Sequence, residues 1–184
     1  MKAFIDIGGW NGVSTEFFLR NHPNGKDFKH FIFEPDLRHI QTLVKKGLNV
    51  IPKAAGVYNG LIDYYYPVKG TLAGGTIYKN KKTGSINPAN HYQVDCIDIR
   101  EFIINLKADY IVVKLNCEGA EYQIIPHIHD LKIDKYYIQW HWDKIGLSKN
   151  DHDYISSLVK WHPWEAQFKS DKFKKQFIAS CDIF

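Results

Sequence analysis

Apolar and polar positions along the first fifty residues follow two alternating patterns. Residues 2–7 form a short apolar run that predicts a buried strand, and residues 11–22 place apolar side chains at helical spacing. The strand pattern returns over residues 28–36, a helical pattern follows over residues 36–47, and residues 48–52 predict a third strand. Strands that alternate with helices are typical of a parallel sheet covered by helices, because the crossover connections are right-handed.

The rest of the chain predicts further strands and helices with one long irregular segment. The expected strands are residues 61–68, 109–116, 135–142, 164–169 and 175–184. The expected helices are residues 95–106, 117–128 and 148–161, the last with a cap at Ser148 or Asn150. Residues 69–90 are rich in Gly, Asn, Lys and Thr and predict a surface loop or a loose hairpin.

Composition and charge narrow the class of protein. The chain has 184 residues, of which 45% are hydrophobic and 24% charged, as in ordinary globular domains, so one domain is expected. No apolar stretch is long enough to cross a bilayer, and Cys96, Cys117 and Cys181 form no paired motif. We therefore expect a cytoplasmic location and no membrane partner. The net charge of +4 is too small to imply nucleic acid on its own.

Glycines follow the first strand at the place where parallel sheets bind ligands. Asp6 lies at the end of this strand, and glycines stand at positions 8, 9 and 12. A dinucleotide fingerprint that starts at position 8 needs glycines at the positions of Trp10 and Val13, so a nicotinamide cofactor is disfavoured. The turn instead suits a ligand whose carboxylate meets helix N–H groups and whose ammonium meets Asp6.

An acid also ends the second strand. Glu34 lies 28 positions after Asp6 (34 − 6), where a carboxylate accepts both hydrogen bonds of a ribose diol. Pro35 and Asp36 follow, so Glu34 alternatively serves as an acid at a helix N-terminus. The two roles are compatible, and the spacing favours ribose binding.

Three ordered segments carry a resemblance to a known family. The glycine turn of residues 4–12 resembles motif I of class I S-adenosylmethionine-dependent methyltransferases. Residues 109–126, "DYIVVKLNCEGAEYQIIP", resemble the "KIDVEGAE" signature of the FkbM-type methyltransferases, and "FIFEPD" at 31–36 resembles the "FEP" segment of that family. The resemblance spans roughly residues 3–143.

The resemblance implies a fold and an activity. The fold would be α/β, a Rossmann-like doubly wound and mostly parallel sheet of about seven strands with an antiparallel last strand. It would form a single domain over residues 1–184 without the N-terminal cap helices of the family. The activity would be methyl transfer from S-adenosyl-L-methionine, which leaves S-adenosyl-L-homocysteine, to a hydroxyl of a sugar or glycan.

The residues expected at the cofactor come from the glycine turn and from the ends of the next strands. They are Asp6, Gly8, Gly9, Trp10, Asn11, Gly12, Ser14, Glu34, Pro35, Lys53, Ala54, Ala55 and Asn116. Trp10 is included because aromatic faces stack on adenine or on sugars.

The acceptor side is expected at the end of the central strand and at a later strand. If the strand continues, Lys114, Asn116 and Glu118 project to one side as a catalytic and substrate-binding clamp, although Glu118 alternatively complements the next helix. His141 is the expected general base, with a structural role between two tryptophans as the alternative. Trp142 is the expected sugar platform.

Two departures from the family leave other functions open. Asn116 stands where the family has Asp, and Gln139 stands where it has Glu, and an amide is neither a base nor a good ligand for a divalent ion. His127 and His129 lack matching ligands nearby, so no metal is expected. The alternatives are an RNA ribose 2'-O-methyltransferase, with nucleic acid an unexpected partner, and a catalytically degenerate fold that binds cofactor without turnover.

Overall fold

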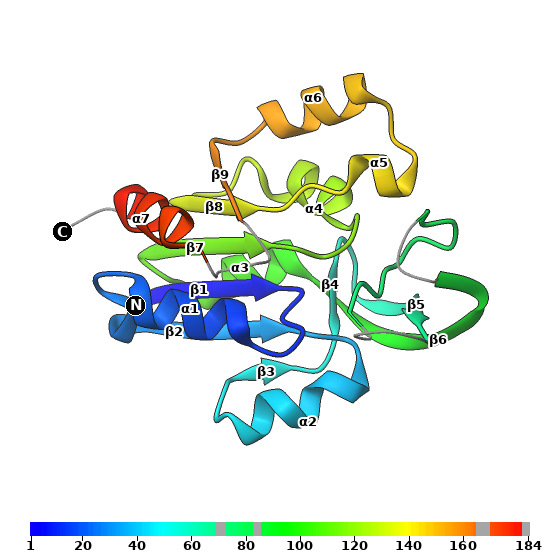
Figure 1. Ribbon diagram of the computed structural model, residues 1–184, viewed down its shortest axis with the longest axis horizontal. Helices are drawn as coiled ribbons and strands as arrows, with labels where there is room; N and C mark the ends of the chain where they lie inside the picture. The colour runs from blue at the N-terminus through cyan, green and yellow to red at the C-terminus, as the bar shows by residue number, and fades with distance from the viewer. Residues whose placement is uncertain (69–72, 83–85, 165–169, 182–184) are drawn as a thin grey trace.

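The computed structural model describes residues 1–68, 73–82, 86–164 and 170–181. A six-stranded parallel sheet has the order β3-β2-β1-β7-β8-β9, and a separate three-stranded sheet has the order β4-β6-β5 (Figure 1). The described part of the chain is therefore a mixed α/β fold that is compatible with a Rossmann-like architecture.

The main sheet and the helices have these bounds. The strands are β1 Lys2–Ile7, β2 Phe28–Phe33, β3 Val50–Ile51, β7 Tyr110–Leu115, β8 Lys135–Ile138 and β9 Trp161–Pro163. The second sheet contains β4 Ala54–Gly56, β5 Gly60–Pro67 and β6 Ile86–Asp98. The helices are α1 Val13–Asn21, α2 Leu37–Lys45, α3 Ile99–Leu106, α4 Glu121–Ile128, α5 Trp142–Ile145, α6 Lys149–Ser157 and α7 Asp171–Ser180, with a 3₁₀ turn, η1, at Gly25–Asp27.

Helices cover both faces of the main sheet because alternate strand residues are apolar on both sides. Phe4 of β1 points to the face where α1 and α7 pack, and Phe18 of α1 stacks on it at 3.9 Å between ring centroids. Ile5 and Val113 point to the opposite face, which α3 and α4 cover. Strands that are buried on both faces read as continuous apolar runs, which is why the local pattern predicted them well.

The strand order reverses between β1 and β7. From β1 the chain builds outward through β2 and β3, and from β7 it builds the other way through β8 and β9. The carboxyl ends of β1, β2 and β7 point toward the second sheet (Figure 1). A crevice beyond such a reversal is where open parallel sheets bind ligands.

The parallel sheet with helices on both faces is confirmed, but among the described residues the main sheet has six strands and not the expected seven or so, and several boundaries need correction. Residues 95–98 belong to β6, so the helix expected over residues 95–106 begins at Ile99, after Asp98 caps it by accepting the backbone N–H groups of two following residues. The strand expected over residues 135–142 ends at Ile138, and α5 begins at Trp142.

The expected strand over residues 61–68 forms as β5, but it joins the second sheet. It pairs antiparallel with β6, so the hairpin alternative for the irregular segment is correct in part. Residues 73–82 connect the two strands, and Thr76 forms an isolated antiparallel bridge with Tyr65. Residues 69–72 and 83–85 lie outside the described part of the chain.

The closing region differs most from the expectation. The antiparallel last strand expected over residues 175–184 is wrong for residues 175–180, which lie in α7, and residues 165–169 and 182–184 lie outside the description. Phe173 and Phe177 are one helical turn apart, and both rings pack against Trp164. In a helix, this i, i+4 aromatic pair lies on one face, where both rings are buried.

The sixth strand is also parallel. β9 pairs with β8 in the parallel sense. The helix expected over residues 148–161 ends earlier, at Ser157, so Trp161 is free to begin β9. Ser148 caps that helix with a reciprocal capping box to Asp151, as one of the two expected caps. Among the described helices, none is long and apolar enough to cross a membrane.

Candidate functional site

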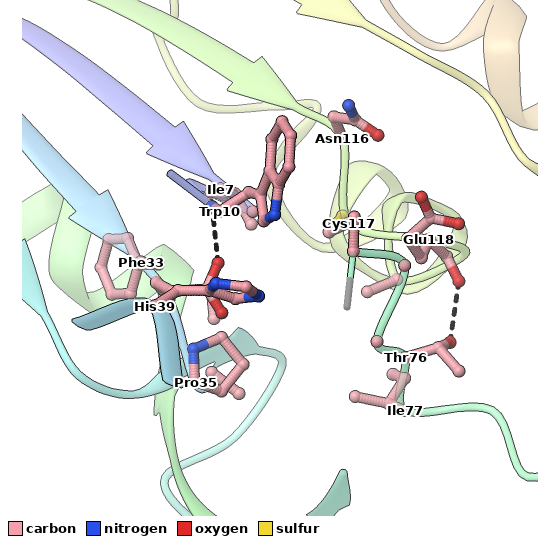
Figure 2. Close-up of a pocket in the computed structure, with 18 of the residues that line it drawn as sticks. Ile7, Trp10, Phe33, Pro35, His39, Thr76, Ile77, Asn116, Cys117 and Glu118 are labelled. Carbon is pink, nitrogen blue, oxygen red and sulfur yellow. Dashed lines mark hydrogen bonds between the residues drawn. The ribbon is translucent and has the colours of Figure 1, made fainter. Parts of the chain in front are cut away.

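A cavity of about 330 Å³ opens where the strand order reverses. Its lining comes from the ends of β1 and β2, from the second sheet, from residues 73–77 and from residues 116–118. Figure 2 shows Pro35 and His39 on one wall and Glu118 and Thr76 on the facing wall. The cavity therefore lies between the two sheets, and its volume suits a small organic molecule.

The glycine turn brings the β1 loop against the loop after β7. Gly8 has φ +87°, and a Cβ at this position would lie 2.1 Å from the backbone oxygen of Asn116. Gly12 has φ +82° and precedes α1, where a Cβ would lie 2.5 Å from a methyl group of Leu48. Only glycine fits both the backbone conformation and the close approach at these positions.

Glu34 lies at the end of β2 with its carboxylate in the cavity wall. One oxygen accepts the backbone N–H of Trp10 at 2.7 Å, and the other accepts the backbone N–H of Asp36 at 2.8 Å. Burial raises the pKa of Glu34 to about 7, against the lowering effect of these two hydrogen bonds. Each carboxylate oxygen keeps a further lone pair, so the group retains the capacity to accept two hydroxyl groups from a ligand.

Trp10 lies beside Glu34 in an uncommon backbone conformation. Its φ is +47°, in the left-handed region that bulky residues avoid, and its side chain is 39% exposed although it lines the cavity (Figure 2). The strained turn points the backbone N–H at Glu34 and places Trp10 in the cavity lining. Strain of this kind is concentrated at ligand-binding sites.

Asp6 does not line the cavity. It is fully buried with Lys114, its register partner on β7, and the Lys114 Nζ lies 2.8 Å from Asp6 Oδ1. Thr15 donates to the other Asp6 oxygen at 2.8 Å, and Lys114 also donates to the Gly8 carbonyl at 2.8 Å. This pair fastens β1, α1 and β7 together, so neither Asp6 nor Lys114 is part of the ligand contacts that we propose below.

The facing wall carries a partly buried ionic cluster centred on Glu118. Lys81 Nζ lies 2.7 Å from Glu118 Oε2, and Lys144 Nζ lies 3.8 Å from the same oxygen. Burial raises the pKa of Glu118, but its interactions with His141, Lys81 and Lys144 outweigh burial, so the pKa of Glu118 is lowered overall. Glu118 is therefore an ionised group at neutral pH with one face toward the cavity.

His141 lies directly behind Glu118 and is 1% exposed. Its Nδ1 is 2.7 Å from Glu121 Oε1, and its Nε2 is 3.6 Å from Glu118 Oε1. The expectation that Lys114, Asn116 and Glu118 alternate along a continued strand is wrong, because β7 ends at Leu115. Glu118 has φ +56°, so a turn, and not the strand, directs it into the cavity.

Two further polar atoms in the wall have no hydrogen-bond partner within the described residues. The side-chain oxygens of Asn116 and Gln139 are both buried, and both residues line the cavity. A buried acceptor without a donor costs free energy unless a ligand or water supplies the donor. This side of the cavity therefore suits a ligand with several hydrogen-bond donors.

The structure brings together most, but not all, of the residues expected from the sequence. Those that line the cavity are Gly8, Trp10, Ser14, Glu34, Pro35, Ala54, Ala55, Asn116 and Glu118. Those that do not are Asp6, Gly9, Asn11, Gly12, Lys53, Lys114, His141 and Trp142. Lys53 pairs with Asp95 at 3.2 Å outside the cavity, and Trp142 stacks on His152.

Sequence reasoning missed the contribution of the second sheet and of the segment after it. Tyr64, His39 and residues 73–77 line the cavity, and Lys81 and Glu121 support Glu118 and His141. The signals in the sequence were the adjacent glycines at 74 and 75 and the second glutamate of the "EGAE" segment. A Cβ at Gly75 would lie 1.9 Å from the Tyr64 hydroxyl oxygen, which explains that glycine.

The two histidines considered as a metal pair lie apart from the cavity. His127 Nε2 is 2.8 Å from Asp98 Oδ1, and His129 Nδ1 is 3.0 Å from the carbonyl of Pro126. Within the described residues, no group of three or more His, Cys, Asp or Glu side chains is arranged to hold a metal ion.

Comparisons with protein-family models, with curated proteins and with solved structures find no match to the chain. The cavity itself and the sequence motifs that line it therefore carry the information about function.

Proposed function

We propose that the protein is an S-adenosyl-L-methionine-dependent O-methyltransferase that methylates a hydroxyl of a sugar or glycan. The observation that carries the proposal is Glu34, a buried carboxylate in the wall of a cavity at the strand-order reversal. A carboxylate at the end of the second strand is the ribose-binding group of nucleoside cofactors in parallel α/β folds.

The lining favours a nucleoside without phosphates. Among the described lining residues there is no lysine or arginine, and much of the wall is apolar, as at Phe33, Ala54 and Ala55. A pyrophosphate would require neighbouring cations or a glycine-rich loop of the dinucleotide type, and the latter is excluded by Trp10 and Val13. An adenosyl group linked to an amino acid, as in S-adenosylmethionine, meets these conditions.

The chemistry of the lining residues supports this cofactor. Glu34 has lone pairs for the ribose hydroxyls, Gly8 and Asn116 form the wall where the β1 and β7 loops meet, and Trp10 offers an aromatic face in the lining. The cofactor would supply an electrophilic methyl group. The protein would hold an acceptor oxygen in line with it, and positioning of this kind lowers the barrier by several kcal/mol or more.

The acceptor side is polar and rich in hydrogen-bond acceptors. Glu118, Asn116 and Gln139 present oxygens there. A polyhydroxylated acceptor such as a sugar offers the matching donors. This match, together with the resemblance of residues 109–126 to the FkbM-type signature, supports a sugar hydroxyl as the methylated group.

Calorimetric titration with S-adenosylhomocysteine tests the cofactor assignment. The wild-type chain is expected to bind it, and Glu34→Gln is expected to weaken binding because one hydroxyl acceptor is replaced by an amide donor. Glu101→Gln is the matched control, since Glu101 accepts a hydrogen bond from Asn59 at 2.7 Å on α3, outside the cavity lining. A wild-type chain that does not bind S-adenosylhomocysteine would refute the proposal.

Transfer of labelled methyl groups tests the reaction. S-adenosylmethionine labelled in the methyl group is incubated with a series of methyl glycosides and with an unstructured RNA. Label in a glycoside is the expected result. Label in RNA would support the ribose 2'-O alternative, and binding without any transfer would support a degenerate cofactor-binding fold.

A further inference from the structure

The imidazole of His141 lies between two carboxylates. Its Nδ1 is 2.7 Å from Glu121 Oε1, and its Nε2 is 3.6 Å from Glu118 Oε1. The side chain is 1% exposed, and its Nε2 has no hydrogen-bond partner within the described residues. A buried ring nitrogen without a partner is rare in folded proteins and calls for a chemical explanation.

The surroundings of Glu121 favour a proton on Nδ1 of His141. Glu121 is fully buried, and its Oε2 accepts the backbone N–H of Gly119 at 3.0 Å and the thiol of Cys117 at 3.3 Å. Three donors, with His141 the third, therefore converge on this carboxylate. A carboxylate that accepts from Nδ1 places the proton of a neutral imidazole on Nδ1 and leaves Nε2 as a proton acceptor.

Glu118 is oriented so that one oxygen faces this acceptor. Lys81 and Lys144 both lie at Oε2, whereas Oε1 faces His141. The backbone of Glu118 is held in its left-handed conformation by Thr76, whose hydroxyl donates to the Glu118 carbonyl at 2.8 Å. The result is two proton acceptors, Oε1 and Nε2, 3.6 Å apart at the edge of the cavity.

We propose that Glu118 and His141 form a relay that takes up the proton of the acceptor hydroxyl, with Glu118 as the catalytic residue and His141 and Glu121 as positioning residues behind it. This inference rests on the proposed methyl transfer. The acceptor O–H bond breaks as its oxygen forms a bond to the methyl carbon. The methyl–sulfur bond breaks, and the sulfur keeps the electron pair. The proton passes by way of Glu118 Oε1 to His141 Nε2.

The relay requires both groups because neither suffices alone. Burial raises the pKa of Glu118, but the contacts with His141, Lys81 and Lys144 lower it by more, so the carboxylate is a weak base. His141 does not line the cavity and cannot reach the acceptor directly. When Nε2 takes up the proton, the ring lies between the carboxylates of Glu118 and Glu121, at 3.6 and 2.7 Å from its two nitrogens.

The relay also specifies the acceptor. Glu118 is an anion in the wall, so a phosphate or carboxylate beside the reacting hydroxyl would be repelled. We infer that the acceptor is a neutral sugar, with the unpartnered side-chain oxygens of Asn116 and Gln139 receiving its other hydroxyl groups.

Nuclear magnetic resonance of the wild-type chain labelled with ¹⁵N in histidine tests the proton position without any acceptor. The neutral His141 ring is expected to carry its proton on Nδ1, with Nε2 in the unprotonated form. Glu121→Gln is expected to weaken this preference. A wild-type ring that carries its proton on Nε2 would overturn the relay.

Turnover of methyl glucoside, galactoside and mannoside tests the chemistry. His141→Gln is expected to lower kcat by about 100-fold or more while the affinity for S-adenosylhomocysteine stays unchanged. Glu118→Gln is expected to show a comparable loss, and Glu121→Gln a smaller one with a displaced pH profile of kcat. The control is Glu16→Gln, because Glu16 pairs with Lys46 at 2.8 Å outside the cavity lining.

The outcomes separate the relay from the proposed function. A wild-type chain that does not bind S-adenosylhomocysteine refutes the methyltransferase proposal itself. Binding with unchanged kcat in His141→Gln refutes the relay alone. Methylation of a phosphorylated or carboxylated sugar in preference to the three neutral glycosides refutes the neutral-sugar assignment.

Discussion

Glu34 is a carboxylate whose charge depends on pH within the physiological range, since burial raises its pKa to about 7. Ribose hydroxyls donate to the ionised form, so a bound nucleoside lowers this pKa and its binding releases a proton. The affinity for S-adenosylhomocysteine is therefore expected to be highest above pH 7 and to fall by up to about tenfold per unit as the pH drops below it. Calorimetry in two buffers of different ionisation enthalpy measures the proton release directly.

Glu34→Gln is the control for this pH dependence. The amide has no proton to release in this range, so its weaker binding is expected to be independent of pH between 5.5 and 8 or so. A wild-type affinity that rises as the pH falls would show that the protonated carboxyl binds the ligand. That result would exclude a hydroxyl-accepting role for Glu34.

Trp10 has a strained backbone and is exposed at its side chain, so we infer that its conformation contributes to ligand binding and not to the stability of the fold. Trp10→Gly removes the cost of a left-handed backbone, about 1 to 2 kcal/mol, but removes the aromatic face as well. We expect the free energy of unfolding in urea to stay the same or rise, while the affinity for S-adenosylhomocysteine falls. A clear loss of stability would instead identify Trp10 as a core residue.

Residue spacing identified part of the site and missed the rest for a physical reason. Trp10 and Glu34 follow strand ends directly, and the carboxyl ends of neighbouring parallel strands always meet at one edge. The roles of Asp6 and His141 depend on partners 108 and 20 positions away in the sequence. Only the register of β1 with β7 and the packing of α4 reveal that these groups are already paired.

At the scale of elements, the loop after β1 lies against the loop after β7. We expect this contact to make replacement of Gly8 more costly than replacement of a glycine outside it. Gly8 and Gly47 both have positive φ, +87° and +70°, but only Gly8 lies against backbone, since nothing lies within 4 Å of a Cβ at Gly47. Gly47→Ala is expected to cost about 1 kcal/mol from its backbone conformation alone. Gly8→Ala is expected to cost more and to abolish S-adenosylhomocysteine binding.

Urea denaturation of the two variants separates the cost of a positive φ from the cost of the steric contact with Asn116. Equal losses would show that the loops separate freely and that the close approach of Gly8 to Asn116 is unimportant. A larger loss in Gly8→Ala would show that the two loops form one rigid wall of the cavity.

Elements were predictable where the local pattern and the tertiary contacts agree. β1 matches its expected bounds because an apolar run that is buried on both faces has no competing structure. The C-terminal segment 175–184 has a short apolar run that fits a strand or a helix, and only packing of Phe177 on the α1 face decides for α7. The second sheet was missed because β5 and β6 pair with each other and not with the expected parallel sheet.

At the scale of the whole molecule, the cavity is a junction between two sheets. Glu34 and Trp10 come from the main sheet, whereas Tyr64 and Thr76 come from the second sheet and the segment bridged to it. Burial and the nearby charge of Glu34 raise the pKa of Tyr64 well above its usual value, so the two sheets already interact electrostatically across the cavity. A ligand in the cavity contacts both sheets at once.

S-adenosylhomocysteine is therefore expected to stabilise the second sheet beyond its effect on the whole chain. At about 100 times Kd it adds about 2.7 kcal/mol to the free energy of unfolding, which corresponds to a rise in Tm of roughly 5 to 10 °C for a chain of this size. Hydrogen exchange should slow most at the amides of Tyr65 and Thr76, which donate to each other's carbonyls at 2.8 and 2.9 Å. The amide of Trp164, which bonds to Ile138 at 3.1 Å away from the cavity, reports the general effect. Equal slowing at all three amides would mean that the ligand contacts the main sheet alone, because only a ligand held between the sheets suppresses their separation.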